Sequence, residues 1–518
     1  MTSTPMERVS LTLFGALLCV GSFAQPGSLD TGFGNGGTLT TDFGIPSAEA
    51  TAIAQLPDGR LLVAGYTNAG ANYDPALAMY LPNGDLDPSF GEGGLVSVSL
   101  DVAAAIHTLA VRPDGRILIA GSAAGSEDGN AIVLQFLPDG TLDPDLGSMG
   151  YVTHSIPGGV VSPRAMVLRP DGGLVLTGNH FVGTVSHLMF IALHADGTPD
   201  ETFGTDGHAT FLPTANNNVA NAMVIQPDGR LVVCGSASGS GSSGNAALLM
   251  ARILPDGSPD ASFGDAGFVI RDVQYPSFAA ANALVLEPDG RITSTGSVGG
   301  SFAPDAFLMR LLADGTPDPS LDNDGFISQE LGAYDFMFGM VRQPDGRYVI
   351  GGWGGSTSSF CLARLNADGS LDPSFTDGDP NNAGPVVTPF GTSISIANAL
   401  VLQADGKVVA CGRGDNTFAL ARYNTGVVSS VSTHTAFKAL PCWPTLVCDQ
   451  EQVNVDLRDL HGKWNYRVLD MRARVLINDS WSAGRINKLD VSKLDAGSYL
   501  LELHSTDGDM RTARFVRE

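Results

Sequence analysis

The sequence predicts an all-β fold: a seven-bladed β-propeller of four-stranded blades, followed by a small C-terminal β-sandwich. Three observations support this prediction. A turn motif recurs seven times, strand patterns fill the intervals between turns, and the two ends of the repeat array complement each other. Self-similarity at a nearly fixed period is the signature of a repeat architecture.

The first turn of each unit is Pro-Asp-Gly or Ala-Asp-Gly, and neighbouring copies lie 56 to 61 residues apart. A glycine stands seven positions after each aspartate. The aspartates are Asp58, Asp114, Asp171, Asp228, Asp289, Asp345 and Asp405, and the glycines are Gly65, Gly121, Gly178, Gly235, Gly296, Gly352 and Gly412.

A second turn follows about halfway through each unit, at Asn83-Gly84, Asp139-Gly140, Asp196-Gly197, Asp256-Gly257, Asp314-Gly315 and Asp368-Gly369. Another aspartate stands four residues after its first residue, at Asp87, Asp143, Asp200, Asp260, Asp318 and Asp372, with a further copy at Asp30. Asp-Gly between two apolar or alternating runs is a strong hairpin signal, because glycine adopts positive φ freely. Each unit therefore reads as four antiparallel strands.

The ends of the array predict that the ring closes. The seventh unit supplies strands at residues 399–403, 407–412 and 418–423 and then lacks a fourth. Residues 28–44, SLDTGFGNGGTLTTDFG, contain the missing piece. An N-terminal strand would complete the last blade and remove the exposed sheet edges that invite aggregation.

Composition limits the partners. The 518 residues carry a formal net charge of −25, and glycine numbers 64. Such an acidic surface disfavours nucleic acid and anionic membrane surfaces. No stretch after the N-terminal region is long and apolar enough to span a bilayer, and we expect a monomer.

The N-terminus resembles a secretory signal peptide. Arg8 precedes an apolar run at residues 11–20, and small residues lead to a cleavage site between Ala24 and Gln25. We therefore expect a signal peptide at 1–24, the propeller at 25–426, a Ser/Thr-rich linker at 427–445 and the C-terminal domain at 446–518.

The repeat resembles the delta-60 repeat family of bacterial β-propellers. Its two motifs appear as PDGRLLVAG from Pro57 and LDPSFGEGG from Leu86. The second motif is altered at residues 142–150, LDPDLGSMG, and at residues 318–325, DPSLDNDG. The resemblance implies architecture and no particular biochemical activity.

The C-terminal segment resembles the sorting domain of proteins exported by the type IX secretion system of Bacteroidetes. The matching residues are Leu494, Ala496-Gly497, Tyr499 and the closing run at residues 514–517. The resemblance implies contact with that machinery and passage through the periplasm and outer membrane of a Gram-negative bacterium, to the cell surface or beyond. An accessory sandwich domain is the alternative.

The cysteines suggest one disulfide. Cys234 and Cys411 occupy equivalent positions in two repeats and are not expected to pair, whereas Cys442 and Cys448 are close in sequence and could pair in an oxidising compartment.

No cofactor is expected, and calcium is the alternative. Turn geometry accounts for the repeated aspartates, since Asp bonds its own backbone in turns. The strongest calcium candidates are Asp318, Asp322, Asp324, Asp377 and Asp379, but neither run fits a twelve-residue calcium loop. Five histidines at positions 154, 180, 187, 194 and 208 are interpreted as scattered surface residues.

We find no catalytic motif, so the sequence favours a non-enzymatic binding module with a glycan or protein ligand. The alternative is a hydrolase or lyase of extracellular polysaccharide, and a structural spacer is a third reading. The two Asp-Gly turns of each unit should share one face of the propeller, called here the turn face. Length varies only in the other connections, which form the loop face, so we expect any ligand site there or at the channel mouth. Arg413-Gly414-Asp415 lies in one such loop and could bind integrins, although coincidence also explains it.

Overall fold

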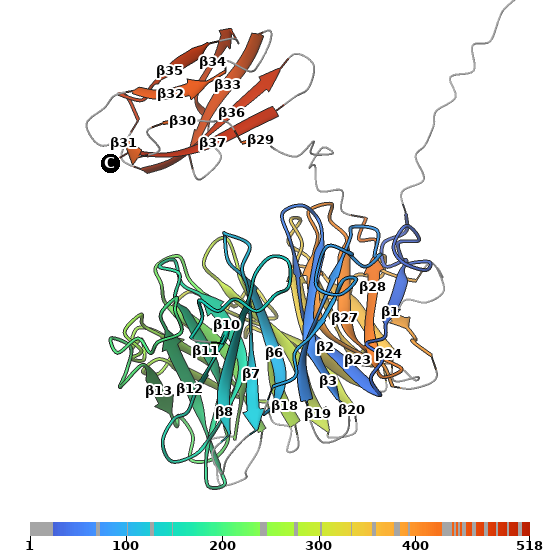
Figure 1. Ribbon diagram of the computed structural model, residues 1–518. Helices are drawn as coiled ribbons and strands as arrows, with labels where there is room; N and C mark the ends of the chain where they lie inside the picture. Colours follow the sequence, from blue (N-terminus) through green and yellow to red (C-terminus); the bar gives the residue numbers. More distant parts are fainter. Residues whose placement is uncertain are drawn as a thin grey trace, which may run out of the picture. The chain divides into compact units, whose positions relative to one another are not determined.

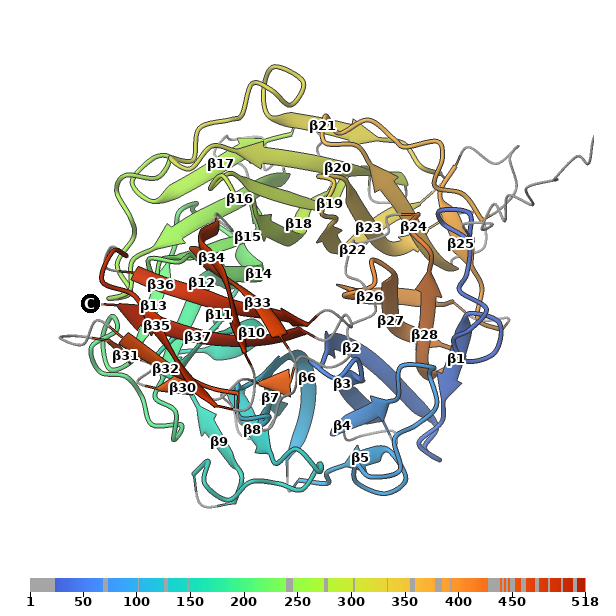
Figure 2. The same cartoon turned by 90° about the horizontal axis from the view of Figure 1, so that it is seen from above.

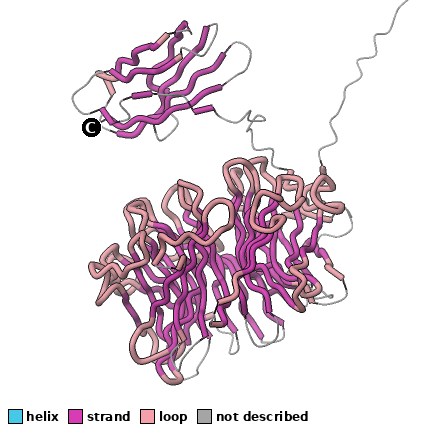
Figure 3. Tube along the Cα trace, viewed as in Figure 1, coloured by secondary structure: helices cyan, strands magenta, loops and turns pink. Residues whose placement is uncertain are grey.

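The computed structural model describes residues 24–517 except 69–72, 101, 125–128, 148, 239–245, 274–277, 301–302, 333, 355–358, 378–383, 392–393, 427–437, 440–441, 444–445, 448–451, 458–462, 471–474, 483–484, 495–496 and 506–509. The chain forms two compact units, Met1–Ser429 and Ser430–Glu518. Strands and loops make up the described part of both (Figure 3). Among the described residues no helix has the length and apolarity that a membrane crossing requires.

The first unit is a propeller of seven four-stranded antiparallel sheets, or blades (Figure 1). Blades 1 to 3 are β2 (Ser47–Gln55), β3 (Leu61–Asn68), β4 (Tyr73–Tyr80) and β5 (Leu95–Ser97); β6 (Ala103–Val111), β7 (Ile117–Ala124), β8 (Asn130–Phe136) and β9 (Tyr151–His154); and β10 (Val160–Leu168), β11 (Leu174–Val182), β12 (Val185–Leu193) and β13 (His208–Phe211).

Blades 4 to 6 continue the pattern with β14 (Asn218–Ile225), β15 (Leu231–Ser238), β16 (Ala246–Ile253) and β17 (Phe268–Asp272); β18 (Phe278–Leu286), β19 (Ile292–Gly300), β20 (Ala303–Leu311) and β21 (Phe326–Gln329); and β22 (Asp335–Arg342), β23 (Tyr348–Gly354), β24 (Ser359–Leu365) and β25 (Val386–Thr388). Figure 2 shows the first strand of each blade nearest the central axis.

Blade 7 confirms the predicted closure. It consists of β26 (Ile396–Leu402), β27 (Val408–Gly414), β28 (Thr417–Tyr423) and, as its outer strand, β1 (Thr38–Thr41) from the N-terminal end. Thr38 stands opposite Ala421, and Thr41 opposite Phe418. Arg422 donates from Nε to Asp30 Oδ2 at 2.7 Å, which adds a buried ion pair to the strand pairing.

The recurring aspartates form the turns that the sequence predicts. In blade 1, Asp58 Oδ1 accepts the backbone N–H of Arg60 at 3.1 Å, and Gly59 has a φ of +89°. The same bond from the residue two positions on recurs at the second turn, for example from Thr141 N to Asp139 Oδ1. An aspartate that bonds its own turn, followed by a glycine, fixes each hairpin.

A β-bulge in the innermost strand explains the repeated glycine. The register between the first two strands shifts at the bulge in all seven blades, in blade 1 between Ala50 and Ala52. A Cβ on Gly65 would lie 2.0 Å from the carbonyl oxygen of Glu49, and one on Gly412 would lie 1.7 Å from that of Ile396. Only glycine fits where the two strands approach this closely.

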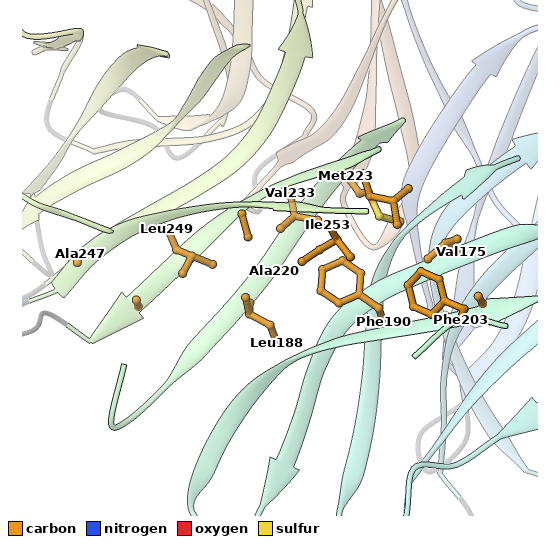
Figure 4. Packing of buried hydrophobic residues seen from close by; sticks show 14 residues of the cluster. Val175, Leu188, Phe190, Phe203, Ala220, Met223, Val233, Ala247, Leu249 and Ile253 are labelled. Atoms are coloured by element: carbon orange, nitrogen blue, oxygen red, sulfur yellow. The ribbon is translucent and has the colours of Figure 1, made fainter. Parts of the chain in front are cut away.

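The core lies between blades. Between blades 3 and 4, Phe190 and Phe203 pack against Leu249 and Ile253, all four almost fully buried (Figure 4). Comparable clusters lie between the other neighbouring blades. Each blade therefore depends on its neighbour to bury its apolar faces, and the ring distributes the core around the axis.

The second unit has two sheets around one core. One sheet contains β29 (Lys438–Ala439), β31 (Leu446–Val447), β33 (Lys463–Asp470), β34 (Val475–Ser482), β36 (Gly497–Ser505) and β37 (Met510–Arg517), and the other contains β30 (Cys442–Trp443), β32 (Gln452–Asp456) and β35 (Ile486–Asp490). Val453, Val468, Leu489 and Leu501 are among the buried residues between them. This arrangement confirms the predicted β-sandwich class.

Candidate functional site

The aspartate that follows each second turn is held by cationic side chains on the turn face. Asp318 Oδ2 accepts Nη1 of Arg291 at 2.9 Å and Nε of Arg310 at 2.7 Å, while Oδ1 accepts the N–H of Ser320 at 2.9 Å. Burial alone would raise the pKa of Asp318, but these hydrogen bonds hold it well below its usual range. We call this arrangement the Asp–Arg clamp.

The clamp recurs in every blade. The other pairs are Asp87 with Arg60, Asp143 with Arg116, Asp200 with Arg169, Asp260 with Arg230 and Arg252, Asp372 with Arg347 and Arg364, and Asp30 with Lys407 and Arg422. Because each carboxylate already has a cationic partner, the turn face spends these aspartates on holding the blades.

The structure does not bring the calcium candidates together. Asp318 belongs to a clamp, and Asp324 Oδ2 accepts Nη2 of Arg271 at 2.7 Å. Asp322 and Asp377 are exposed, and Asp379 lies outside the described residues. Among the residues that are described, no three His, Cys, Asp or Glu side chains are arranged to hold a metal ion.

A ring of side chains at the seven bulges surrounds the axis. These residues, here the bulge ring, are Thr51, His107, Arg164, Asn221, Asn282, Phe338 and Asn398, each seven positions before a turn aspartate. Four of them donate to a backbone carbonyl on the innermost strand of the next blade.

Thr51 Oγ1 donates to Ile106 O at 2.9 Å and Asn282 Nδ2 to Met337 O at 2.8 Å. Asn221 Nδ2 donates to Ala281 O at 3.1 Å, and Asn398 Nδ2 donates to Ala50 O at 2.9 Å across the closure. The innermost strand of a blade has one unpaired edge, so these donors satisfy carbonyls that the sheet leaves open.

An aromatic cluster spans blades 5 and 6 on the loop face. Trp353 stacks on Phe336 with ring centroids 4.9 Å apart and on Tyr334 with centroids 6.0 Å apart, while Phe278 of blade 5 meets Phe336 edge-on at 5.6 Å. The Tyr334 side chain stays 37% exposed, whereas the other three are half-buried. The buried indole N–H of Trp353 finds no acceptor. We call these four residues the aromatic cluster.

Three carboxyl groups lie close to the aromatic cluster in sequence and in the sheet. Asp335 follows Tyr334 and is fully buried, with Oδ2 accepting the N–H of Leu331 at 2.7 Å. Burial, with smaller contributions from Asp305 and Glu330, raises the pKa of Asp335 to about 6. Burial and the charge of Glu330 also raise the pKa of Asp305. None of the three carboxyl groups forms an ion pair within the described residues.

A polar group joins blades 7 and 1 on the same face. Glu49 accepts Tyr66 Oη at 3.2 Å, Asn398 Nδ2 at 2.9 Å and Arg413 Nη1 at 3.4 Å. Burial and then the Glu49 charge raise the pKa of Tyr66 far above its usual value. The Arg-Gly-Asp segment predicted as a loop spans the end of β27 and a hairpin turn whose Asp415 has a φ of 46°, and its arginine is engaged by Glu49.

The histidines include one pair that sequence parity did not predict. His180 and His187 face each other across β11 and β12 with ring centroids 6.1 Å apart, and His180 is 4% exposed with both ring nitrogens unpartnered. Burial lowers the pKa of His180. A pair of imidazoles without a third ligand gives no metal geometry.

The remaining predicted positions are placed as follows. Cys234 and Cys411 are free and buried, as is Cys361. Cys448 lies outside the described residues, so the Cys442–Cys448 disulfide stays a prediction. Gln25 donates from Nε2 to Thr376 Oγ1 at 3.3 Å, next to the expected cleavage after Ala24, and most of the expected signal peptide lies outside the described residues.

Hollows on the turn face follow the repeat. One between blades 1 and 2 is lined by Asp58, Arg60, Pro113 and Pro138. Its equivalent between blades 3 and 4 is lined by Asp171, Asp228 and Pro255. A hollow that the repeat itself generates distinguishes no ligand, which leaves the aromatic cluster as the most individual feature of the loop face.

Comparison with protein families places both units. Residues 56–90, 112–145, 226–263, 287–321, 343–375 and 403–426 match the model described as a domain of unknown function (DUF5122) beta-propeller. The chain carries DUF5122 β-propeller repeats. These matches confirm the resemblance found in the two repeat motifs, and the unit around Asp171, outside the matches, folds as blade 3 with the same four strands.

Residues 449–517 match the secretion system C-terminal sorting domain. The sorting domain supports export or cell-surface display by a bacterium of the Bacteroidetes type, and it implies interaction with the type IX secretion machinery. No curated protein matches the chain.

Solved structures with related topology are distant. A fungal alcohol oxidase of the AA5 family in complex with copper is 14% identical with a TM-score of 0.42, covering 93% of this chain and 98% of the oxidase. The polysaccharide lyase Uly1 is 11% identical with a TM-score of 0.42, covering 78% of this chain and 93% of the lyase. Sqt1 from Chaetomium thermophilum is 12% identical with a TM-score of 0.38, covering 76% and 98%. Similarity at this level carries no argument about activity.

Proposed function

We propose that this protein is an exported, non-enzymatic binding module that holds a glycan on the aromatic cluster of blades 5 and 6. The single observation that supports this proposal is the stacked arrangement of Tyr334, Phe336 and Trp353 beside an exposed loop face. In this proposal the type IX machinery carries the chain from the periplasm across the outer membrane of a Gram-negative cell, guided by the sorting domain.

Stacked aromatic rings suit a sugar ligand. Pyranose rings present flat apolar C–H faces, and an aromatic side chain offers a large surface of matching polarity with little rotamer freedom to lose. Packing against Trp353 fixes the Tyr334 ring, which keeps 37% of its surface exposed. The two partly accessible carboxyl groups, Asp305 and Glu330, would accept hydroxyl hydrogens and would disfavour an anionic sugar at this position.

Two observations favour binding over the alternative of a polysaccharide hydrolase or lyase. Asp335 has a pKa of about 6, in the range of a general acid, but it is fully buried and contacts the backbone of its own loop. Tyr66 has a pKa raised far above neutrality, so its phenol stays protonated and is a poor general base. Neither group combines access with a suitable pKa.

The test is a glycan array on the full chain, followed by calorimetry with each glycan that binds. We expect Tyr334→Ala to weaken binding about tenfold, the loss typical of removing one aromatic anchor. Tyr73→Ala is the matched control, because Tyr73 is 39% exposed on the loop face of blade 1. Equal loss in both variants, or no glycan bound by the wild type, would refute the proposal. Cleaved glycan in the product analysis would instead favour the enzyme.

A further inference from the structure

One member of the bulge ring departs from the pattern set by the others. Thr51, Asn221, Asn282 and Asn398 each donate to a carbonyl of the next blade. Arg164, in the same position of blade 3, forms no hydrogen bond or ion pair with any described residue. Its guanidinium has five N–H donors, so the position carries more hydrogen-bonding capacity than its neighbours and uses less of it.

The rest of the propeller makes this exception informative. Residues 25–426 contain sixteen arginine and lysine side chains, all within the described part of the chain. Fourteen of them form ion pairs. Arg112 instead bonds Gln135 and the carbonyls of Gly172 and Ala195. Arg164 is left over, in a protein with a net charge of −25.

Its surroundings are those of a binding position. The Arg164 side chain is accessible to solvent, yet the protein around it lowers the pKa of the guanidinium by desolvation. A charge that is partly desolvated without an opposite charge costs free energy, and a ligand that supplies the opposite charge recovers it. Nothing in the fold requires this cost, since asparagine serves at the same position in three other blades.

His107 stands next to Arg164 in the ring, on the preceding blade. Burial and the positive charge of Arg164 lower the pKa of His107 to about 4, so its imidazole is neutral near pH 7 and offers one N–H donor. The pair therefore presents one fixed positive charge and a neutral donor on two adjacent innermost strands, β6 and β10.

We propose that Arg164, assisted by His107, binds an oxyanion group of a ligand at the axis of the propeller. A planar guanidinium pairs with a carboxylate or sulfate through two parallel N–H···O bonds. The acidic surface of the propeller repels anions elsewhere, which makes this position selective. The site is separate from the aromatic cluster and does not depend on the function proposed for it.

Calorimetry on the full chain at low ionic strength tests the proposal. The probes are an oligogalacturonate, a sulfated oligosaccharide, inorganic sulfate and, as the uncharged control, a neutral oligosaccharide. We expect at least one oxyanion probe to bind, and Arg164→Asn to weaken it about tenfold or more, as for loss of a charge-assisted hydrogen bond. Which probe binds distinguishes a uronate, a sulfated sugar and a free anion as the source of the group.

Arg164→Asn introduces the side chain that the ring uses elsewhere, so we expect its melting temperature to equal or exceed that of the wild type. Arg164→Gln is the second variant if the first folds poorly, and Arg485→Asn, which removes an exposed arginine of the other unit, is the control. Retained affinity in a folded Arg164 variant, or a wild type that binds none of the oxyanion probes, would overturn the proposal.

Discussion

The two faces of the propeller use aspartate in opposite ways. On the turn face, the carboxylates of the Asp–Arg clamps are nearly buried, accept hydrogen bonds from cationic side chains, and recur in every blade. On the loop face, Asp305 and Asp335 occur once each, have no cationic partner, and have raised pKa values. The comparison teaches that repetition marks the charges that hold the fold, whereas an unpaired charge in a single blade marks an individual role.

Breaking one clamp should have the largest effect. Asp318→Asn leaves Arg310, which is 3% exposed, without its counter-charge, and we expect the free energy of unfolding to fall by about 3 kcal/mol. Denaturant unfolding monitored by fluorescence measures this. Asp322→Asn, four residues away and exposed with a φ of 45°, is the matched control and should change stability by less than about 0.5 kcal/mol. Equal losses would show that the clamp contributes nothing specific.

Asp335 should produce the opposite pH dependence. Its folded pKa of about 6 lies above the ordinary value of 3.8, so the folded protein favours the protonated carboxyl. The contribution of Asp335 to stability is therefore complete below pH 3.8 and is lost as pH rises through about 6. At neutral pH the buried charge costs up to about 3 kcal/mol.

Asp335→Asn tests this sign through unfolding curves measured across that pH range. We expect the substitution to stabilise the protein at pH 7 and to have little effect near pH 4, because Asn218 fills the equivalent buried position in blade 4 with its amide fully bonded. Asp260→Asn, at a clamp whose pKa is lowered to about 2, should destabilise at neutral pH. A destabilised Asp335→Asn at pH 7 would contradict the assignment.

Removing one donor from the bulge ring should have the smallest effect. Thr51→Val keeps the shape of the side chain but deletes the hydroxyl that donates to Ile106 O, and we expect a loss of about 1 kcal/mol in unfolding free energy. Thr153→Val, at an exposed position of the outer strand β9, is the control. Indistinguishable melting temperatures would mean that the ring does not tie neighbouring blades together.

The sequence was sufficient for the architecture because hairpin chemistry is local. Asp58-Gly59 and its copies set the turns, and the spare strand near Thr38 indicated the closure. The calcium candidates show where local reasoning fails. Asp318 resembles a ligand beside Asp322 and Asp324, but its actual partners, Arg291 and Arg310, lie in other strands and become visible only with the sheet register.

The candidate sites were harder to predict for the same reason. Tyr334, Phe336 and Trp353 come from two strands, and Phe278 comes from another blade. A bulge leaves no composition signature, but the position seven residues before each turn aspartate was available, and aligning the units there would have isolated Arg164 among threonine and asparagines. The interpretation of the histidines as scattered missed the His180–His187 pair because it compared residues along one strand rather than across two.

The strand that closes blade 7 is made first and paired last. β1 waits for β28, with Thr38 meeting Ala421 only after the whole array has been synthesised, and until then the edge of β28 has no partner. The entropic cost of closing so long a loop grows only logarithmically with its length, but contacts this far apart in sequence slow folding. A chain cut short at either end of the propeller would therefore lose the clasp of the ring, and an open edge able to recruit a second chain would take its place.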